Sequence, residues 1–198
     1  MRKKREFTFD QWVERVFVGR PPSWDWMWEN AFHPRKEEWL VTYPTRLFQD
    51  PEFLIGKYSD RQLRKGFGNL PNRWELGDSI WTRNLAWKLR KSCIRAMVPL
   101  FERFFSRKPL GHTCHMWWDL LRYFGDDREE RVVNEMFLAL EKILLLDSLD
   151  CQAAALHGLG HLDHSDKESL IRKYLNEHRD LHPDIRRYAT SCIKGNVL

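Results

Sequence analysis

Hydrophobic residues recur at steps of three and four along most of the chain, and this spacing places them on one face of a helix. Strands would show alternating apolar and polar positions rich in β-branched residues, and the chain has no run of that kind. The helical pattern is clearest over residues 129–146, where an apolar face lies opposite charged residues. That face consists of Val132, Val133, Met136, Phe137, Leu140, Ile143 and Leu144. The pattern predicts an all-α protein.

Residues at the helix ends predict several helix starts. In a capping box, a hydroxyl and a side-chain carbonyl three residues later satisfy the free backbone amides of a first helical turn. The chain contains three such boxes, each of which predicts the start of a helix. They are Thr8-x-x-Gln11, Ser59-x-x-Gln62 and Ser165-x-x-Glu168.

Two longer stretches are expected to interrupt or connect helices. A helix is predicted over residues 78–105, and Pro99 should kink or divide it because proline has no backbone N–H to donate. Residues 20–34 contain the run "PPSWDWMW", for which we expect an ordered loop held in place by its indole side chains.

The second half of the chain contains an internal repeat. Cys151, Ala155 and Leu159 are followed 34 positions later by Ile185, Ala189 and Ile193, and an amphipathic stretch at 166–178 lies between them. Met116, Leu120, Phe124 and Gly125 precede Cys151, Ala155, Leu159 and Gly160 by 35 positions. This period, with two helices in each unit, is typical of an α-solenoid in which each helix pair buries its apolar face on the next.

The repeat leads to a prediction of the domain organisation. We expect one all-α domain over residues 1–198, with a basic tail at 1–6 and an irregular helical half at 7–105. Repeats should occupy 112–198, as units near 112–146, 149–178 and 183–198.

Part of the repeat resembles a known family. "HPDIRRYATSCIKG" is similar to a HEAT-repeat helix, with Pro183, Ile185, Arg186, Ala189 and Ile193 in the positions of its usual pattern. "YSDRQLRKGF" at 58–67, "CHMWWD" at 114–119, "ALHGLGH" at 155–161 and the ending "GNVL" resemble a group of uncharacterised bacterial HEAT-like proteins. The resemblance implies a HEAT-like α–α superhelix, a short right-handed solenoid of helix pairs, and it implies no particular activity.

Charge and composition narrow the classes of function. The formal charge is +5, and Arg2, Lys3, Lys4 and Arg5 against Glu6 supply +3 of it, so the rest of the chain is nearly neutral. Purely apolar runs such as "ILLL" at 143–146 are too short to span a bilayer. No apolar stretch follows the basic N-terminus as in a secretory signal, so we expect a cytoplasmic location.

The four cysteines lie far apart in apolar contexts and should be reduced core thiols.

Three histidines in the stretch 155–166 permit two interpretations. His157 and His161 are four residues apart and share a helix face, as in many zinc sites, and His164 can add a third ligand. A zinc peptidase would carry a general-base Glu after the first histidine, where this chain has Gly158. Alternatively, Gly158 and Gly160 allow close helix contact while His157 hydrogen-bonds across the interface.

A second candidate is the run Trp117-Trp118-Asp119. It resembles a run in DNA glycosylases for alkylated bases, which are also built on HEAT-like repeats and carry a further aspartate three residues later. Here that position is Arg122, which would repel the cationic sugar of the transition state, so the resemblance does not extend to the chemistry. We expect both tryptophans to pack between repeats and Asp119 to cap a helix or form a salt bridge.

The favoured prediction is a non-enzymatic module that binds a protein partner and needs no cofactor. Immunity to a toxin or regulation is one role that the bacterial resemblance suggests, although a pI near 9.1 does not suit an inhibitor of basic nuclease toxins. One alternative is a nucleic-acid-binding protein, and another is a metal-dependent hydrolase that uses His157, His161 and His164. The expected partner-binding residues are His115, Trp118, Asp119, His157, His161 and Arg187, and the expected phosphate contacts are Arg2, Lys3, Lys4, Arg5, Lys88, Arg90, Lys91 and Arg95.

Overall fold

The computed structural model describes residues 8–19, 38–71, 76–122 and 128–197. Helices make up the regular structure in this part of the chain, and a single isolated bridge joins Ile55 to Tyr58. The all-α prediction is therefore confirmed. The predicted loop at 20–34 and the basic side chains of residues 2–5 lie outside the described residues.

The helices fall into two halves of the chain. The first half contains α1 (Phe9–Phe17), α3 (Trp39–Gln49), a short 3₁₀ turn (Glu52–Leu54), α4 (Asp60–Asn69), α5 (Asp78–Trp81), α6 (Trp87–Leu100) and a π-helical turn (Phe101–Phe105). The second half contains α7 (His112–His115), α8 (Glu130–Leu144), α9 (Leu149–His161), α10 (Lys167–Glu177) and α11 (Pro183–Ile193).

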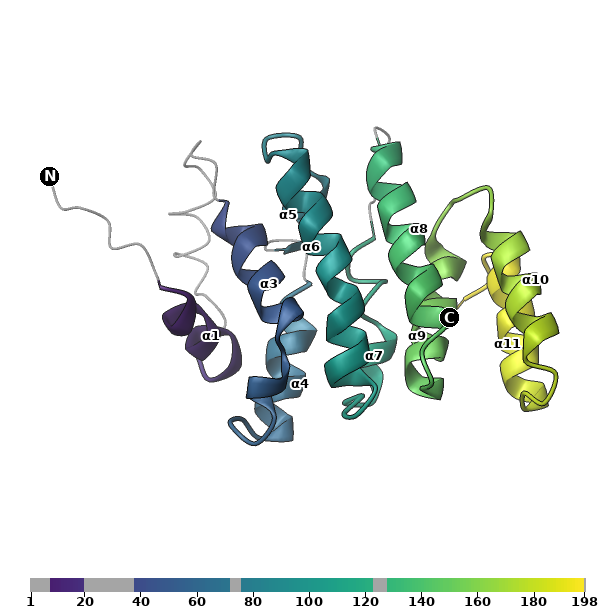
Figure 1. Ribbon diagram of the computed structural model, residues 1–198, viewed down its shortest axis with the longest axis horizontal. Coiled ribbons are helices and arrows are strands. Elements are labelled where there is room, and N and C mark those ends of the chain that lie inside the picture. Colours follow the sequence, from purple (N-terminus) through teal and green to yellow (C-terminus); the bar gives the residue numbers. More distant parts are fainter. Residues whose placement is uncertain (1–7, 20–37, 72–75, 123–127, 198) are drawn as a thin grey trace, which may run out of the picture.

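These helices pack as two layers. In one layer α3, α6, α8 and α10 each contact the next member, and in the other α1, α4, α7, α9 and α11 do so. The layers are joined where α8 packs on α9 and α10 packs on α11. Figure 1 shows the helices side by side in approximately chain order along the long axis of the molecule. Helices from the three predicted repeat units, α7, α9 and α11, are therefore neighbours.

Two of the three capping boxes form as predicted. Thr8 and Ser59 each accept a hydrogen bond from the backbone N–H of the glutamine three residues later, and that glutamine accepts one in return. The predicted box at Ser165 is wrong, because α10 begins one residue later with Asp166 at its N-cap. The Ser165 hydroxyl donates to the Asp166 carboxylate instead.

The predicted helix over 78–105 divides earlier than expected. The break lies between α5 and α6, where the Arg90 side chain donates to the carbonyls of Ile80 and Leu85 and holds the two ends together. Pro99 lies inside α6 and removes one backbone donor near the helix end. The π-helical turn that follows at Phe101–Phe105 is a form that often accompanies such a local loss of regular hydrogen bonding.

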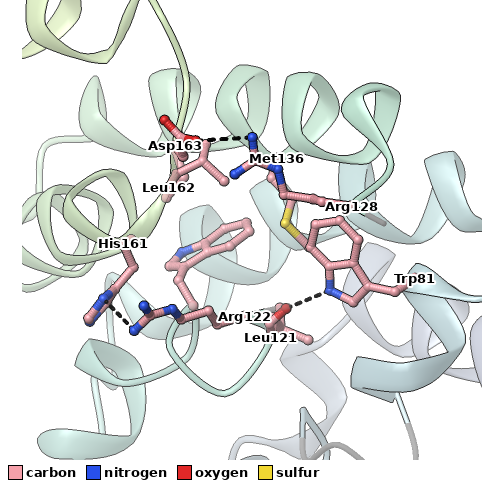
Figure 2. Close-up of a pocket in the computed structure, with 11 residues that line it drawn as sticks. Trp81, Leu121, Arg122, Arg128, Met136, His161, Leu162 and Asp163 are labelled. Carbon is pink, nitrogen blue, oxygen red and sulfur yellow. Dashed lines mark hydrogen bonds and ion pairs between the residues drawn. The ribbon is translucent and has the colours of Figure 1, made fainter. Parts of the chain in front are cut away.

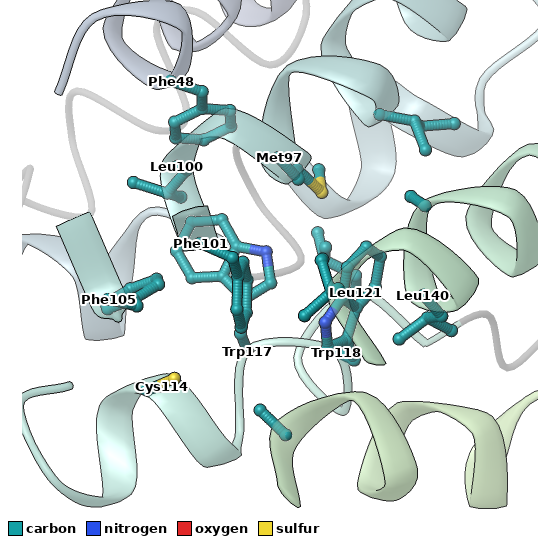
Figure 3. Close-up of a cluster of buried hydrophobic side chains, with 14 of the residues drawn as sticks. Phe48, Met97, Leu100, Phe101, Phe105, Cys114, Trp117, Trp118, Leu121 and Leu140 are labelled. Carbon is teal, nitrogen blue, oxygen red and sulfur yellow. The ribbon is translucent and has the colours of Figure 1, made fainter. Parts of the chain in front are cut away.

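Fully buried rings from the first half and from the segment after α7 form a group that we call the aromatic core. Phe67 lies 4.9 Å from Phe104 and Trp117 lies 5.4 Å from Phe48, measured between ring centroids. Figure 3 shows Phe101, Phe105 and Trp117 converging between α6 and the segment that follows α7. The aromatic core consists of Phe48, Phe67, Phe101, Phe104, Phe105 and Trp117.

Other buried residues agree with the sequence patterns. Cys93, Cys114, Cys151 and Cys192 are buried free thiols, as predicted. The amphipathic helix expected over 129–146 is α8, whose apolar face is buried. Among the residues that the structure describes, no helix is long and apolar enough to cross a membrane.

Candidate functional site: a histidine cluster beside a pocket

The candidate site forms where α9 packs between α11 and the segment 112–122. Ser148 caps α9 by accepting a hydrogen bond from the Cys151 backbone N–H, which fixes the start of the helix. His157 and His161 follow one turn apart near its C-terminal end. A Cβ added at Gly158 would lie 2.8 Å from Trp118, so the glycine permits this close approach of α9 to the segment 112–122.

His157 is the most deeply buried member of the site. Its side chain is fully buried, and its Nδ1 lies 2.7 Å from the Tyr188 hydroxyl of α11. The interpretation that His157 hydrogen-bonds across a helix interface is therefore confirmed. Its Nε2 is also buried and has no hydrogen-bond partner among the described residues. Burial, together with the neighbouring His115 and His161, lowers the pKa of His157 to about 4.

His161 has contacts at both ring nitrogens. Its Nε2 lies 3.3 Å from Asp119 Oδ1, and its Nδ1 lies 3.3 Å from Arg122 Nη1. Because a guanidinium can only donate, Nδ1 accepts and the ring proton lies on Nε2, where it is donated to Asp119. Burial lowers the pKa of His161, the Arg122 charge lowers it further, and Asp119 opposes the shift.

His115 completes the group. Its ring centroid lies 4.4 Å from that of His157, and its Nε2 lies 3.4 Å from the Tyr188 hydroxyl. Burial, followed by the charge of His112, lowers the pKa of His115. We call His115, Asp119, His157, His161 and Tyr188 the histidine cluster. Its imidazoles are neutral near pH 7, and neutral imidazoles can accept protons or bind metal ions.

A pocket of about 180 Å³ adjoins the histidine cluster and shares His161 with it. Its polar lining includes Arg122, Arg128 and Asp163, and Arg128 lies 3.2 Å from Asp163. Figure 2 shows Arg122 pointing toward His161 and the Arg128–Asp163 pair at the opposite edge. Its apolar lining is formed by Trp81, Trp118, Leu121, Met136, Leu140 and Leu162.

The structure brings most of the predicted partner-binding residues together. His115, Asp119, His157 and His161 are members of the cluster, and Trp118 is buried beneath it, at 4% exposure, and lines the pocket. Arg187 lies apart from them, since it is exposed and pairs with Asp184 within α11. Tyr188, the next residue along α11, lies in the cluster at the position that was expected for Arg187.

His164 does not join the predicted metal ligands. Its ring stacks on Phe137 at a centroid distance of 3.9 Å, and its Nε2 lies 3.1 Å from Asn134 Oδ1. Its Nδ1 accepts a hydrogen bond from the Asp166 backbone N–H. α9 ends at His161, so His164 lies on the following turn and is directed at α8. Asp119, His157 and His161 instead form a group whose ligand atoms all lie within 4.8 Å of one another.

The predicted phosphate contacts on α6 mostly have internal partners. Arg90 is 1% exposed and forms a 2.7 Å ion pair with Glu129, so it does not reach the surface. Lys91 and Arg95 both pair with Glu135. Lys88 is exposed. Two carboxylates, of Glu135 in α8 and of Glu129 just before it, therefore offset half of the positive charge of these four residues.

Sequence reasoning missed two residues of the site, Tyr188 and Arg122. Tyr188 lies on the same face of α11 as the buried Ala189 and Cys192, and a hydroxyl on a buried face requires a partner. That requirement was a usable signal. Arg122 stands where the glycosylase pattern has an aspartate, and its contact with His161 depends on how the segment 112–122 folds, which no local pattern indicates.

A comparison with protein-family models, curated proteins and solved structures finds no match to this chain. The resemblance to bacterial HEAT-like proteins therefore stays a prediction, and the function must be argued from the geometry of the site.

Proposed function

We propose that this protein is a HEAT-like helical scaffold that binds a protein partner through the pocket beside the histidine cluster. The two layers of helices and the adjacency of α7, α9 and α11 support a solenoid of helix pairs. In such folds, successive helix pairs align residues from different repeats into one binding surface. The pocket has this character, because it is lined from α5, the segment 112–122, α8 and α9.

The observation that carries the proposal is the combination of apolar and cationic residues in the pocket. The apolar side is large enough for one aliphatic or aromatic side chain, and two arginines against one aspartate line the polar side. This combination suits a partner segment with an apolar residue next to a carboxylate.

The existing ion pair does not prevent such binding. Arg128 pairs with Asp163 and with Glu130, whose side chains are 85% and 72% exposed, and exposed pairs of this kind contribute only about 0–1 kcal/mol each. A carboxylate from the partner would replace Asp163 at little cost. A partner carboxylate that becomes buried at the rim would form a stronger, charge-assisted hydrogen bond with the guanidinium.

Selection of a random-peptide library on the full-length protein tests the proposal. We expect enrichment of peptides with Leu, Phe or Trp beside Asp or Glu, and we expect Arg128→Gln to weaken their binding about 10-fold or more, as loss of a buried charge pair predicts. Arg172→Gln is the matched control, since Arg172 also pairs with an exposed carboxylate, that of Glu168, on a helix remote from the pocket. Failure to enrich any peptide, or equal binding by the two variants, would contradict the proposal. Enriched peptides that bind only at low salt and are displaced by single-stranded DNA would identify a nucleic-acid surface instead.

A further inference from the structure

The strongest unassigned feature is the group formed by Asp119, His157 and His161. One ligand-type atom of each residue lies within 4.8 Å of the others, and all three side chains are buried or partly buried. Buried carboxylates and imidazoles cost free energy unless their polar atoms find partners. In this group one polar atom, His157 Nε2, is buried without a partner among the described residues.

The surroundings of His157 favour a ligand at that atom. With its Nδ1 proton donated to the Tyr188 oxygen at 2.7 Å, the ring presents a lone pair at Nε2. Histidines that bind metals almost always donate the other ring N–H to a nearby oxygen, which fixes the tautomer and the ring orientation. Tyr188 supplies that oxygen, and its own hydroxyl lies 3.4 Å from His115 Nε2. The ring is therefore already held in a ligand's orientation.

Asp119 and His161 already have the spacing of two ligands. His161 Nε2 and Asp119 Oδ1 lie 3.3 Å apart, and donor atoms around a tetrahedral ion with bonds of about 2.0–2.1 Å lie roughly 3.4 Å apart. A cation between them would replace the proton that His161 now donates to Asp119. That proton would move to Nδ1, so Arg122 would turn away from His161. Two imidazoles and one carboxylate match the preference of zinc and its neighbours rather than that of magnesium or calcium.

We propose that Asp119, His157 and His161 bind one divalent transition-metal ion of the zinc type, with Tyr188 as the residue that positions His157. Three protein ligands leave the fourth position of a tetrahedral ion to water or another external ligand. The site needs only small side-chain rotations, because the ligand atoms start within 4.8 Å of one another. This inference does not depend on the partner proposed above, since it concerns the free protein.

Titration of tag-free, chelator-treated protein with Co²⁺ tests the site directly. We expect one equivalent to bind and to produce the intense visible absorption of a tetrahedral cobalt centre, and we expect Zn²⁺ to remove that absorption by competition. His157→Ala and His161→Gln should each weaken binding about 100-fold or more, and Asp119→Asn about 10-fold or more, in line with the loss of one ligand. Tyr188→Phe keeps the ring in place but removes the oxygen, so it should weaken binding about 10-fold.

His112→Ala and His164→Ala are the matched controls, because both remove a histidine near the site that is not one of the three ligands. Both should bind Co²⁺ as the unaltered protein does. Circular dichroism of each variant separates loss of a ligand from loss of the fold, and Tyr188→Phe gives a second measurement if His157→Ala unfolds. Absence of stoichiometric binding, or equal loss in the two control variants, would overturn the proposal.

Discussion

The aromatic core and the histidine cluster lie back to back on the same short segment. Trp117 enters the aromatic core, whereas His115 and Asp119, two residues to either side, face α9 and α11. The core is composed of rings in contact with rings, at centroid distances such as 4.9 Å between Phe67 and Phe104. The cluster is composed of polar side chains that hydrogen-bond to one another, and these bonds satisfy most but not all of their buried polar atoms. One segment therefore serves two regions of opposite chemistry.

The two regions differ in the chemistry of their buried nitrogen atoms. Within the part of the chain that the structure describes, each region has a buried nitrogen without a hydrogen-bond partner, Trp117 Nε1 in the core and His157 Nε2 in the cluster. The indole nitrogen can only donate, and it lies among phenyl rings that hold no ligand atoms. The imidazole nitrogen can accept, and His157 belongs with Asp119 and His161 to a group of ligand-type residues suited to a cation. This contrast agrees with the proposal that the core stabilises the fold and that the cluster binds a ligand.

Trp117→Ala is the substitution that should separate the two regions most strongly. Removing a fully buried indole leaves a cavity beside four phenylalanine rings and should lower the free energy of unfolding by about 3–5 kcal/mol. His115→Ala removes a partly exposed ring from the other side of the same segment and should cost about 1 kcal/mol. Urea denaturation followed by circular dichroism measures both. If the two variants lost the same free energy of unfolding, the two sides of this segment would not differ in their contribution to stability.

Most of the fold could be predicted because it depends on local patterns. The apolar face of α8 and the caps at Thr8 and Ser59 are encoded within a few residues, and the structure agrees with them. The break before α6 could not be predicted in the same way. Arg90 holds it through carbonyls of residues 80 and 85 and through Glu129, 39 positions further along the chain. Such contacts are tertiary, so the spacing of apolar residues along the sequence does not reveal them.

The site could be predicted only in part, for the same reason. Helical spacing alone places His157 and His161 on one face, and the two glycines between them, Gly158 and Gly160, indicate close packing. Asp119 was singled out from its neighbouring tryptophans, but its pairing with His161 depends on how the segment before it is placed. His164 was assigned by proximity in sequence, although α9 ends at His161 and turns it toward Phe137 instead.

The junction between the regions can be tested at Gly158, where α9 meets Trp118. A Cβ there would lie 2.7 Å from Leu140 Cδ2 and 2.8 Å from Trp118 Cβ, and the latter is too close to the backbone to move easily. Gly158→Ala should therefore lower the free energy of unfolding by about 2 kcal/mol, because overpacking exceeds the gain in helix propensity.

Gly68→Ala, within α4, is the matched control for this effect. A Cβ at Gly68 meets nothing within 4 Å, so only the propensity gain remains and the variant should be more stable by about 0.5–1 kcal/mol. Thermal denaturation of both variants checks the opposite signs. A stabilised Gly158→Ala protein would show that α9 does not pack on Trp118 as closely as the structure indicates.

The response of stability to mild acid distinguishes the two regions by charge. Burial lowers the pKa of His157 to about 4, so between its ordinary pKa near 6.5 and that value the unfolded chain binds a proton that the folded chain does not. Stability contributed by the neutral ring is therefore lost as pH falls. From pH 7 to 5.5 the metal-free protein should lose about 1 kcal/mol through this residue.

His157→Leu should lose less over the same interval, whereas a core variant such as Phe48→Leu should keep the full pH dependence, because the aromatic core contains no titratable group. Urea denaturation at the two pH values measures these slopes, and an unchanged slope in His157→Leu would mean that the cluster does not hold this ring neutral.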